Sequence, residues 1–224
     1  MKRKIRTVLF SSLLIALSLF PIFVYAQEQA KHYVDNGKCK LCHNIPHNGK
    51  QYTICRSKPH ANAFDTLFEK KARRFADERG IALPPYEAPE CLKCHVTGYD
   101  VKTRSVPKEL KADDGVQCGS CHGPGSAHMQ DGKLLRMNKG AKVDLRKNIL
   151  MPNNQTCIAC HNEESPPWNP KKYTLESGEK TGFDFERAVV VIAHPNPNRS
   201  SRTAAALRKA AASPWRIDSS IPNK

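Results

Sequence analysis

Aromatic residues are scarce in this sequence: two Trp, six Tyr and eight Phe occur among 224 residues, which also include 16 Pro and 12 Gly. Side chains alone therefore offer little of the apolar area whose burial drives folding. Acidic residues are also few, with 21 Asp and Glu against 36 Lys and Arg. Beyond the first 26 residues, no stretch approaches the ~18 apolar residues of a membrane span. These shortages exclude an ordinary aromatic-rich core and any later transmembrane helix.

The one long apolar run lies at the N-terminus and is typical of a secretory signal peptide. Four basic residues precede residues 8–24, which are apolar apart from serines and Pro21, and Val24-Tyr25-Ala26 forms a small-residue cleavage site. Because Pro21 interrupts the run and the cleavage site closes it, we expect cleavage after Ala26 rather than a membrane anchor. The mature protein, residues 27–224, is then a single periplasmic domain with no stable membrane span and a loose tail from about residue 200.

Four C-x-x-C-H motifs use eight of the nine cysteines. This spacing lets two thiols form thioethers to one porphyrin edge and places the following histidine under the iron as the proximal ligand. A zinc site, a dithiol or a disulfide framework would explain the cysteine pairs but not the histidine that follows each. We therefore expect four covalently bound haem c groups, in a mainly α, compact multihaem fold with extensive irregular loops. The motifs contribute Cys39, Cys42 and His43; Cys91, Cys94 and His95; Cys118, Cys121 and His122; and Cys157, Cys160 and His161.

The strong positive charge does not indicate a nucleic acid partner. Removing the four basic residues of the signal leaves 32 basic and 21 acidic residues, a formal charge of +11, which the haem propionates reduce further. The remaining charge suits steering towards an acidic redox partner. Basic residues gather in residues 133–148, which are either a solvated face or a docking patch.

Hydrophobic periodicity predicts a helix over residues 60–80, with Gly80 as its C-cap, and a second over 185–194, capped by Asp184. Asn153 or Asn154 is a candidate N-cap for a helix carrying the fourth motif. Residues 99–101 and 104–106 are expected to pair as a short hairpin, and residues 201–212 to form a terminal basic helix.

Five histidines lie outside the motifs and are available as second axial ligands. His60 and His194 stand at the ends of the two expected amphipathic helices, and His128 follows the turn forced by Gly123-Pro124-Gly125. His32 and His47 lie in polar stretches and are expected at the surface. Three good candidates for four irons leave one iron open, unless His47 or a methionine such as Met129 fills it.

These features resemble the cytochrome c-554 family of tetrahaem cytochromes. The resemblance rests on Cys91-Leu92-Lys93-Cys94-His95-Val96-Thr97-Gly98-Tyr99, on Gly115-Val116-Gln117-Cys118-Gly119-Ser120-Cys121-His122-Gly123-Pro124-Gly125, and on the fourth motif with the downstream helix. It implies that His43 shares a haem with His128, His122 with His194, and His161 with His60, while the His95 haem is five-coordinate. The segment before His60 departs from the family pattern. It inserts His47, the alternative sixth ligand, and Cys55, to which we assign no role.

Family members pass electrons in the periplasm; the best known serves hydroxylamine oxidation, and nitric oxide reduction has been suggested for the open haem. The resemblance therefore implies a relay between periplasmic or membrane-associated redox proteins. The alternative is an oxidoreductase acting on nitrogen oxides or hydroxylamine at the His95 haem. The sequence shows no unambiguous proton donor and lacks the C-x-x-C-K site of pentahaem nitrite reductases, so electron transfer is favoured over catalysis.

Overall fold

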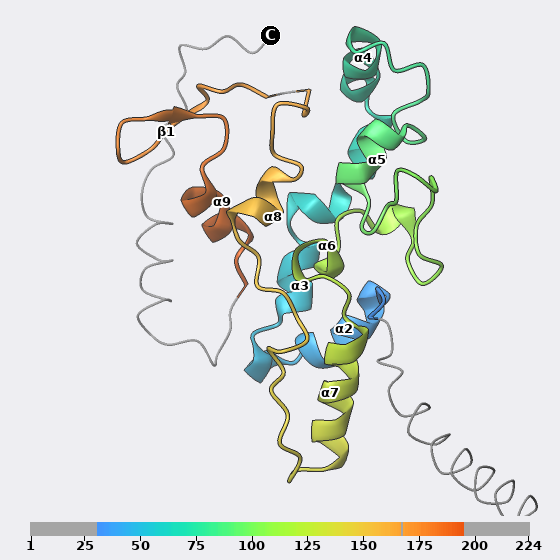
Figure 1. The fold of residues 1–224 in the computed structure, drawn as a ribbon, viewed down its shortest axis with the longest axis vertical. Coiled ribbons are helices and arrows are strands. Elements are labelled where there is room, and N and C mark those ends of the chain that lie inside the picture. Colours follow the sequence, from blue (N-terminus) through green and yellow to red (C-terminus); the bar gives the residue numbers. More distant parts are fainter. Residues whose placement is uncertain (1–30, 167, 195–224) are drawn as a thin grey trace, which may run out of the picture. The chain divides into compact units, whose positions relative to one another are not determined.

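The structure, a computed structural model, describes residues 31–166 and 168–194. Its elements all lie in the unit His32–Lys224 and are mainly helical, as the mainly α part of the expected fold class requires (Figure 1). The α-helices are α2 (Asn36–His43), α3 (Gln51–Arg56), α4 (Lys70–Glu78), α5 (Pro89–His95), α6 (Cys118–His122), α7 (Ser126–Met137), α8 (Asn154–Ile158) and α9 (Phe185–Ile192). Short 3-10 turns are η1 (Pro46–Asn48), η2 (Pro59–Asn62), η3 (Asp65–Phe68) and η4 (Ala112–Asp114), and β1 (Tyr173–Thr174) pairs antiparallel with β2 (Lys180–Thr181). None of the helices described here is long and apolar enough to cross a membrane.

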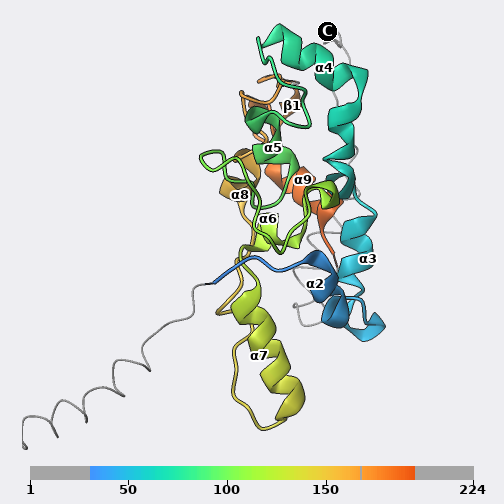
Figure 2. The ribbon, with the colours of Figure 1, turned by 90° about the vertical axis from the view of Figure 1, so that its right-hand side faces the viewer.

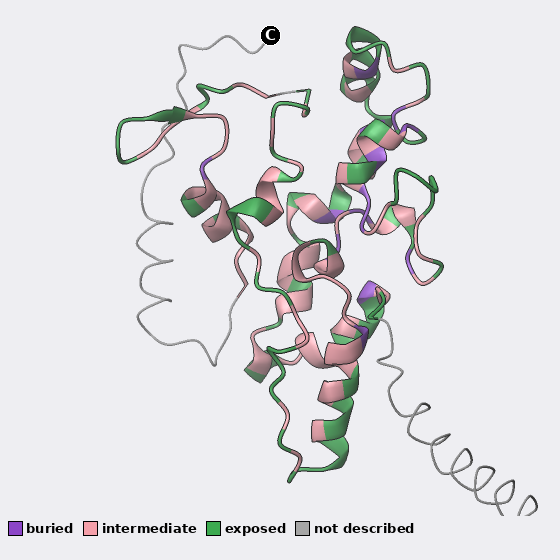
Figure 3. Ribbon diagram, in the orientation of Figure 1, coloured by how far each residue is buried: buried purple, intermediate pink, exposed green. Residues whose placement is uncertain are grey.

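The side-chain core is small and lies around α5. Leu67, Leu92 and Val96 are buried together, and Phe64 and Tyr99 are among the partly buried residues that pack against them. Most of the described chain is only partly buried or exposed (Figure 3). The scarcity of aromatic residues thus corresponds to a small side-chain core.

The helices that carry the motifs are short, and local chemistry sets where they begin and end. Pro89 opens α5 at a position where its missing N–H costs nothing, and the Asn153 side chain caps α8 in a capping box with Thr156, as expected. Gly123, with φ +73°, ends α6 in the left-handed region that glycine favours. In the fourth motif α8 ends at Ile158, and a turn continues to His161, whose N–H donates to Cys157 O at 2.9 Å.

The prediction of a single helix over residues 60–80 is wrong. The segment forms η2, η3 and α4 in succession, with Glu69 extended between the last two. The carbonyl of Ala63 is the reason, because it accepts from Nδ1 of His95 at 2.6 Å and from the Thr66 hydroxyl at 2.7 Å. Leu67 instead donates to Phe64 O, which is a 3-10 contact. Gly80, with φ +66°, follows the C-cap residue of α4, and this terminator is confirmed.

Three further expectations need correction. Helix α9 ends at Ile192, so His194 lies two residues beyond the helix rather than at its end; Asp184 caps it as expected, accepting from the Arg187 N–H. The hairpin over residues 99–106 is reduced to one bridge between Asp100 and Ser105. Helix α7 and the β1–β2 hairpin were not expected. The signal peptide, the 201–212 helix and the C-terminal tail lie outside the described residues.

A buried threonine ties the second motif to the third. Thr97, 1% exposed, donates its hydroxyl to Gly115 O at 3.1 Å, and that hydroxyl accepts from the Gln117 N–H and contacts Ser120 Oγ at 2.7 Å. Gly115, with φ +67°, has room for no side chain, because a Cβ there would meet Ala61 O at 2.8 Å. This close approach lets the Val116 N–H donate to His60 O at 3.0 Å, so the Gly-Val pair positions a histidine distant in sequence.

Candidate functional site

Three histidine pairs face one another in the structure. The ring centroids lie 6.0 Å apart for His43 and His128, 5.9 Å for His60 and His161, and 5.9 Å for His122 and His194. The angles between the ring planes are 24°, 71° and 40° respectively. Each pair joins a motif histidine to one of the three non-motif histidines selected from the sequence, in the pairing that the family resemblance implies.

This spacing fits an iron ion held between two imidazoles. Metal–imidazole bonds are about 2 Å long and the ring centre lies roughly 1 Å beyond the nitrogen, so trans ligands of one metal have centroids about 6 Å apart. The rings are too far apart for direct stacking contact. The donor atoms and their separation therefore suit the bis-histidine haem iron that the motifs call for.

Backbone carbonyls orient several of these rings. Nδ1 donates to Leu150 O at 2.8 Å in His122, to Leu145 O at 2.9 Å in His128, and to Ala63 O at 2.6 Å in His95. Because a carbonyl oxygen can only accept, Nδ1 carries the proton and Nε2 is left with its lone pair free for a metal. No sequence pattern predicts these contacts, since backbone groups have no residue identity.

Burial favours the neutral form of several of the paired histidines, and this is the form that ligates metal. Burial is the main cause that lowers the pKa of His43, with the charge of His128 adding to it. The pKa values of His60, His161 and His194 are also lowered, again chiefly by burial and secondarily by neighbouring cationic or titrating groups. The charged form of these side chains is disfavoured by desolvation.

His95 differs from the other three motif histidines. Its Nδ1 is held by Ala63 O and lies 3.3 Å from Thr66 Oγ1, but no second histidine ring faces it within residues 31–166 and 168–194. Within the same ranges the rings of His32 and His47 face no other histidine. His32 contributes only its backbone, which exchanges hydrogen bonds with Ser126.

Cysteines of different motifs lie against one another. A hydrogen bond between the Cys39 and Cys118 thiols is the main cause that lowers the pKa of Cys39 and raises that of Cys118 to about 12. The Cys94 and Cys160 thiols form a second such contact, which lowers the pKa of Cys94 and raises that of Cys160. Cys121 is near enough to Cys157 for their charges to interact, although burial is the main reason that its pKa is raised to about 11.

These contacts place the attachment sites in the order first, third, fourth, second. The first and third motifs meet where helices α2 and α6 pack together (Figure 1). The second and fourth motifs are joined by the ion pair of Lys93 with Glu164. The thiols that shift one another's pKa belong to these same pairs of motifs. No cluster of three or more His, Cys, Asp or Glu side chains suited to a metal ion occurs among the residues whose structure is described.

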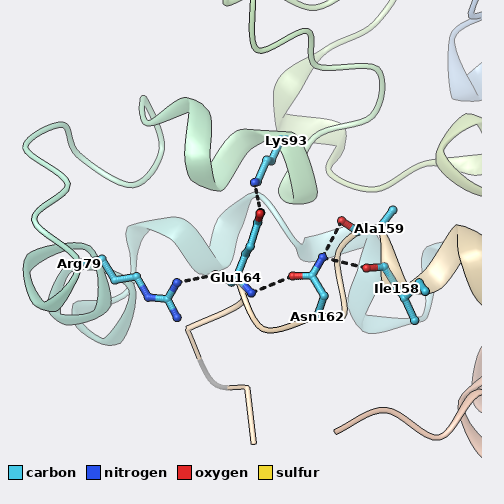
Figure 4. A network of polar contacts seen from close by, with 6 residues as sticks. All are labelled: Arg79, Lys93, Ile158, Ala159, Asn162 and Glu164. Atoms are coloured by element: carbon cyan, nitrogen blue, oxygen red, sulfur yellow. Dashed lines mark hydrogen bonds and ion pairs between the residues drawn. The ribbon is translucent and has the colours of Figure 1, made fainter. Parts of the chain in front are cut away.

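Polar contacts join the second and fourth motifs (Figure 4). Lys93, inside the second motif, pairs with the Glu164 carboxylate, and Arg79 donates to Glu164 O at 2.9 Å. Asn162, next to His161, accepts from the Glu164 N–H at 2.9 Å and donates to Ile158 O at 2.8 Å. The segment after the fourth motif is thus attached both to its own helix and to the second motif.

Two residues near the site carried no functional prediction. Phe183 lies flat against the His161 ring, with centroids 4.9 Å apart and planes at 16°; an aromatic just before the N-cap Asp184 was the available signal. Cys55, in α3, forms a hydrogen bond with the Cys118 thiol that is the main cause raising its pKa. The ninth cysteine therefore lies beside the attachment site of the third motif.

Known proteins with similar sequences are cytochromes of the c-554 type. The family described as cytochrome c554 and c-prime matches residues 38–123. Cytochrome c-554 of Nitrosomonas europaea is 30% identical over 173 residues, which cover 68% of this chain and 69% of that protein. The chain belongs to the cytochrome c-554 family. As a member, it is a c-type cytochrome of electron transfer with covalently bound haem c.

A solved structure of a cytochrome c554 family member is also similar. The reduced state of cytochrome c554 from Nitrosomonas europaea has 26% sequence identity, a TM-score of 0.40, and coverage of 69% of this chain and 76% of its own.

Proposed function

We propose that this member of the cytochrome c-554 family is a periplasmic tetrahaem cytochrome that relays single electrons between redox proteins. The close packing of the motifs carries this proposal, since α2 packs on α6 and Lys93 of the second motif pairs with Glu164 beside the fourth. Attachment edges that touch bring neighbouring cofactors close together, and electron transfer rates fall steeply with separation. The order of the motifs supports a continuous path whose ends are the His43 and His95 sites.

The chain's own residues have defined tasks in this relay. Each haem c, when bound, supplies a one-electron Fe(III)/Fe(II) couple. Eight motif cysteines anchor the four groups covalently, and the four motif histidines are the proximal ligands. When haem is bound, His60, His128 and His194 would hold the iron of the fourth, first and third motifs together with the motif histidines that they face. Backbone carbonyls hold the imidazoles of His122 and His128 in place, which would keep reorganisation small when the bound group gains or loses an electron.

The test begins with composition. The intact mass of the exported protein should exceed that of the chain cleaved after Ala26 by four haems, and a pyridine haemochrome assay should give four haems per chain. With less than one reducing equivalent per protein, the electron should then equilibrate among the sites at a rate independent of protein concentration. Fewer than four haems, or an exchange rate proportional to protein concentration, would contradict an internal relay.

A second function is favoured by one observation, the lack of a facing histidine at His95. An iron with one protein ligand can bind a diatomic molecule, which supports a candidate oxidoreductase for nitrogen oxides or hydroxylamine at this site. Binding of nitric oxide or cyanide is necessary for that function but is also compatible with a passive relay station. Steady turnover of nitric oxide or hydroxylamine far above the rate of free haem would establish it, and its absence would leave electron transfer alone.

A further inference from the structure

Helix α7 and the returning segment form a basic lobe, defined here as residues 126–151. In Figures 1 and 2, α7 extends away from the other labelled helices, and the chain returns alongside it. The lobe has six basic and two acidic residues. Both acidic side chains are engaged within the lobe, since Asp131 accepts from Asn148 at 2.7 Å and Asp144 pairs with Arg146. All six basic residues are exposed, so the lobe presents a net positive charge to solvent.

The remaining cations of the lobe are exposed and have no ion-pair partner in the described part of the chain. On α4, by contrast, two of the four basic residues are paired locally: Arg73 with Asp77 and Arg74 with Glu78. An unneutralised cluster of one sign raises the local concentration of oppositely charged partners. The unpaired lobe cations are Lys133, Arg136, Lys139, Lys142 and Lys147.

The exposed face of α7 also has an apolar centre. Leu134 is 48% exposed and Met137 is 87% exposed; along the helix, Leu134 directly follows Lys133 and Met137 directly follows Arg136. A small apolar centre with a charged rim is the usual anatomy of a protein interface, in which Met and Arg are enriched. Transient redox encounters need only a small area of this kind.

The base of the lobe is part of the candidate haem sites. His128, on the first turn of α7, faces His43, and its Nδ1 donates to Leu145 O. Leu150, also in the lobe, supplies the carbonyl that orients His122. A protein bound to the lobe would therefore stand next to the His43 end of the proposed relay, at the opposite end from His95.

We infer that the basic lobe is the docking surface for an acidic electron-transfer protein, which exchanges one electron with the His43 site during each encounter. The inference rests on the proposed relay and adds where the partner binds and what charge it has. An anionic membrane is the less suitable partner, because residues 126–151 contain no Trp, Tyr or Phe and interfacial helices use such side chains as anchors.

The experiment compares two variants of the haem-loaded protein. The lobe variant carries Lys133→Gln, Arg136→Gln, Lys139→Gln and Lys142→Gln. The matched control removes four exposed lysine charges elsewhere, through Lys70→Gln, Lys71→Gln, Lys102→Gln and Lys108→Gln. Reduced flavodoxin, an acidic protein that loses one electron from its flavin per ferric haem reduced, is the docking probe. Uncharged, photochemically reduced lumiflavin is the probe that needs no docking.

The lobe variant should be reduced by flavodoxin about tenfold or more slowly than the parent at low ionic strength, and the difference should shrink as salt screens the charges. The control should keep the parent rate to within about twofold, and lumiflavin should reduce all three proteins alike. Equal slowing of both variants, or no slowing of the lobe variant, would overturn the inference. Loss of binding to phosphatidylglycerol vesicles with an unchanged flavodoxin rate would also overturn it. Failure of lumiflavin to reduce the parent would instead contradict the relay.

Discussion

Phe183 stacks on the imidazole of His161, with ring centroids 4.9 Å apart and planes at 16°. The His60 ring, which faces His161, stands at 71° to it, whereas the planes of His43 and His128 are at 24° to each other. The relative orientation of two axial imidazoles sets the splitting of the iron d orbitals, and hence the anisotropy of the low-spin EPR signal. By stacking on His161, Phe183 fixes the plane of one of the two imidazoles at the fourth-motif site. The angle between the imidazole planes is what distinguishes this site from the first-motif site.

Replacing Phe183 by Leu should shift the EPR signal of the His161 site, because the imidazole loses the ring that restricts its rotation. Aromatic stacking of this kind contributes about 0.5–1.5 kcal/mol beyond area burial, enough to select one orientation. Phe183→Tyr keeps the ring and should restore the parent signal. Phe75→Leu, which removes a partly buried ring on α4, is the control and should leave the spectrum as it is. An unchanged spectrum in Phe183→Leu would contradict the positioning role.

His128→Ala should convert one low-spin haem to high-spin, since the His43 site would lose the ring that faces it at 6.0 Å. His32→Ala should have no such effect, because that residue contributes only backbone hydrogen bonds. Optical and EPR spectra of the two ferric variants measure the spin state of their haems. If the His128 variant retained every low-spin signal, the assignment of His128 as an axial ligand would be wrong.

The His95 site should be the one that accepts added ligands. The ferric protein should show a high-spin EPR component from about one haem in four, as expected of an iron without a sixth protein ligand, and cyanide should convert that component first. Cyanide titration followed by EPR measures this directly. A protein whose four haems are all low-spin and unreactive would indicate that His47 or a methionine supplies the sixth ligand.

Glu164→Gln should lower the melting temperature at neutral pH and lose this effect in acid. The hydrogen bond with Lys93 is the main cause that lowers the pKa of Glu164, so its stabilising contribution is present above the ordinary carboxyl pKa of about 4.3 and disappears as pH falls through the lowered folded-state value. Melting curves of parent and variant from neutral pH to about pH 3 should therefore converge. Because both side chains are largely exposed, the difference should be small and should shrink in salt. A constant difference at all pH values would exclude an ionic origin.

Cys55→Ser should leave four haems attached. Although Cys55 contacts Cys118, no second cysteine and histidine at the required spacing accompany it. Cys118→Ser should instead remove one thioether bond, which shifts the pyridine haemochrome band of that haem. Haem loss from the Cys55 variant would show that the ninth thiol supports the third attachment site.

The sequence by itself determined the attachment chemistry. Each C-x-x-C-H motif is complete within five consecutive residues, so local spacing alone predicts the thioether anchors and the proximal histidine. The sequence also predicted where several helices begin and end, because capping signals act over one helical turn. These signals are the N-caps Asn153 and Asp184 and the terminator Gly80. The prediction of a continuous helix over residues 60–80 failed because His95 donates to the Ala63 carbonyl in place of a helical N–H. Local periodicity cannot reveal a partner so distant in sequence.

Tertiary structure alone decided how distant residues meet. His43 and His128 are 85 positions apart, and His60 and His161 are 101 apart, yet each pair is brought to about the spacing of two ligands on one metal. The sequence reduced the candidates to His60, His128 and His194, but only through family resemblance could it say which motif each one serves. The touching cysteines, the carbonyls that orient the imidazoles and the stacking of Phe183 on His161 have no sequence signature of their own. They arise when separate segments pack together, and packing depends on the whole chain.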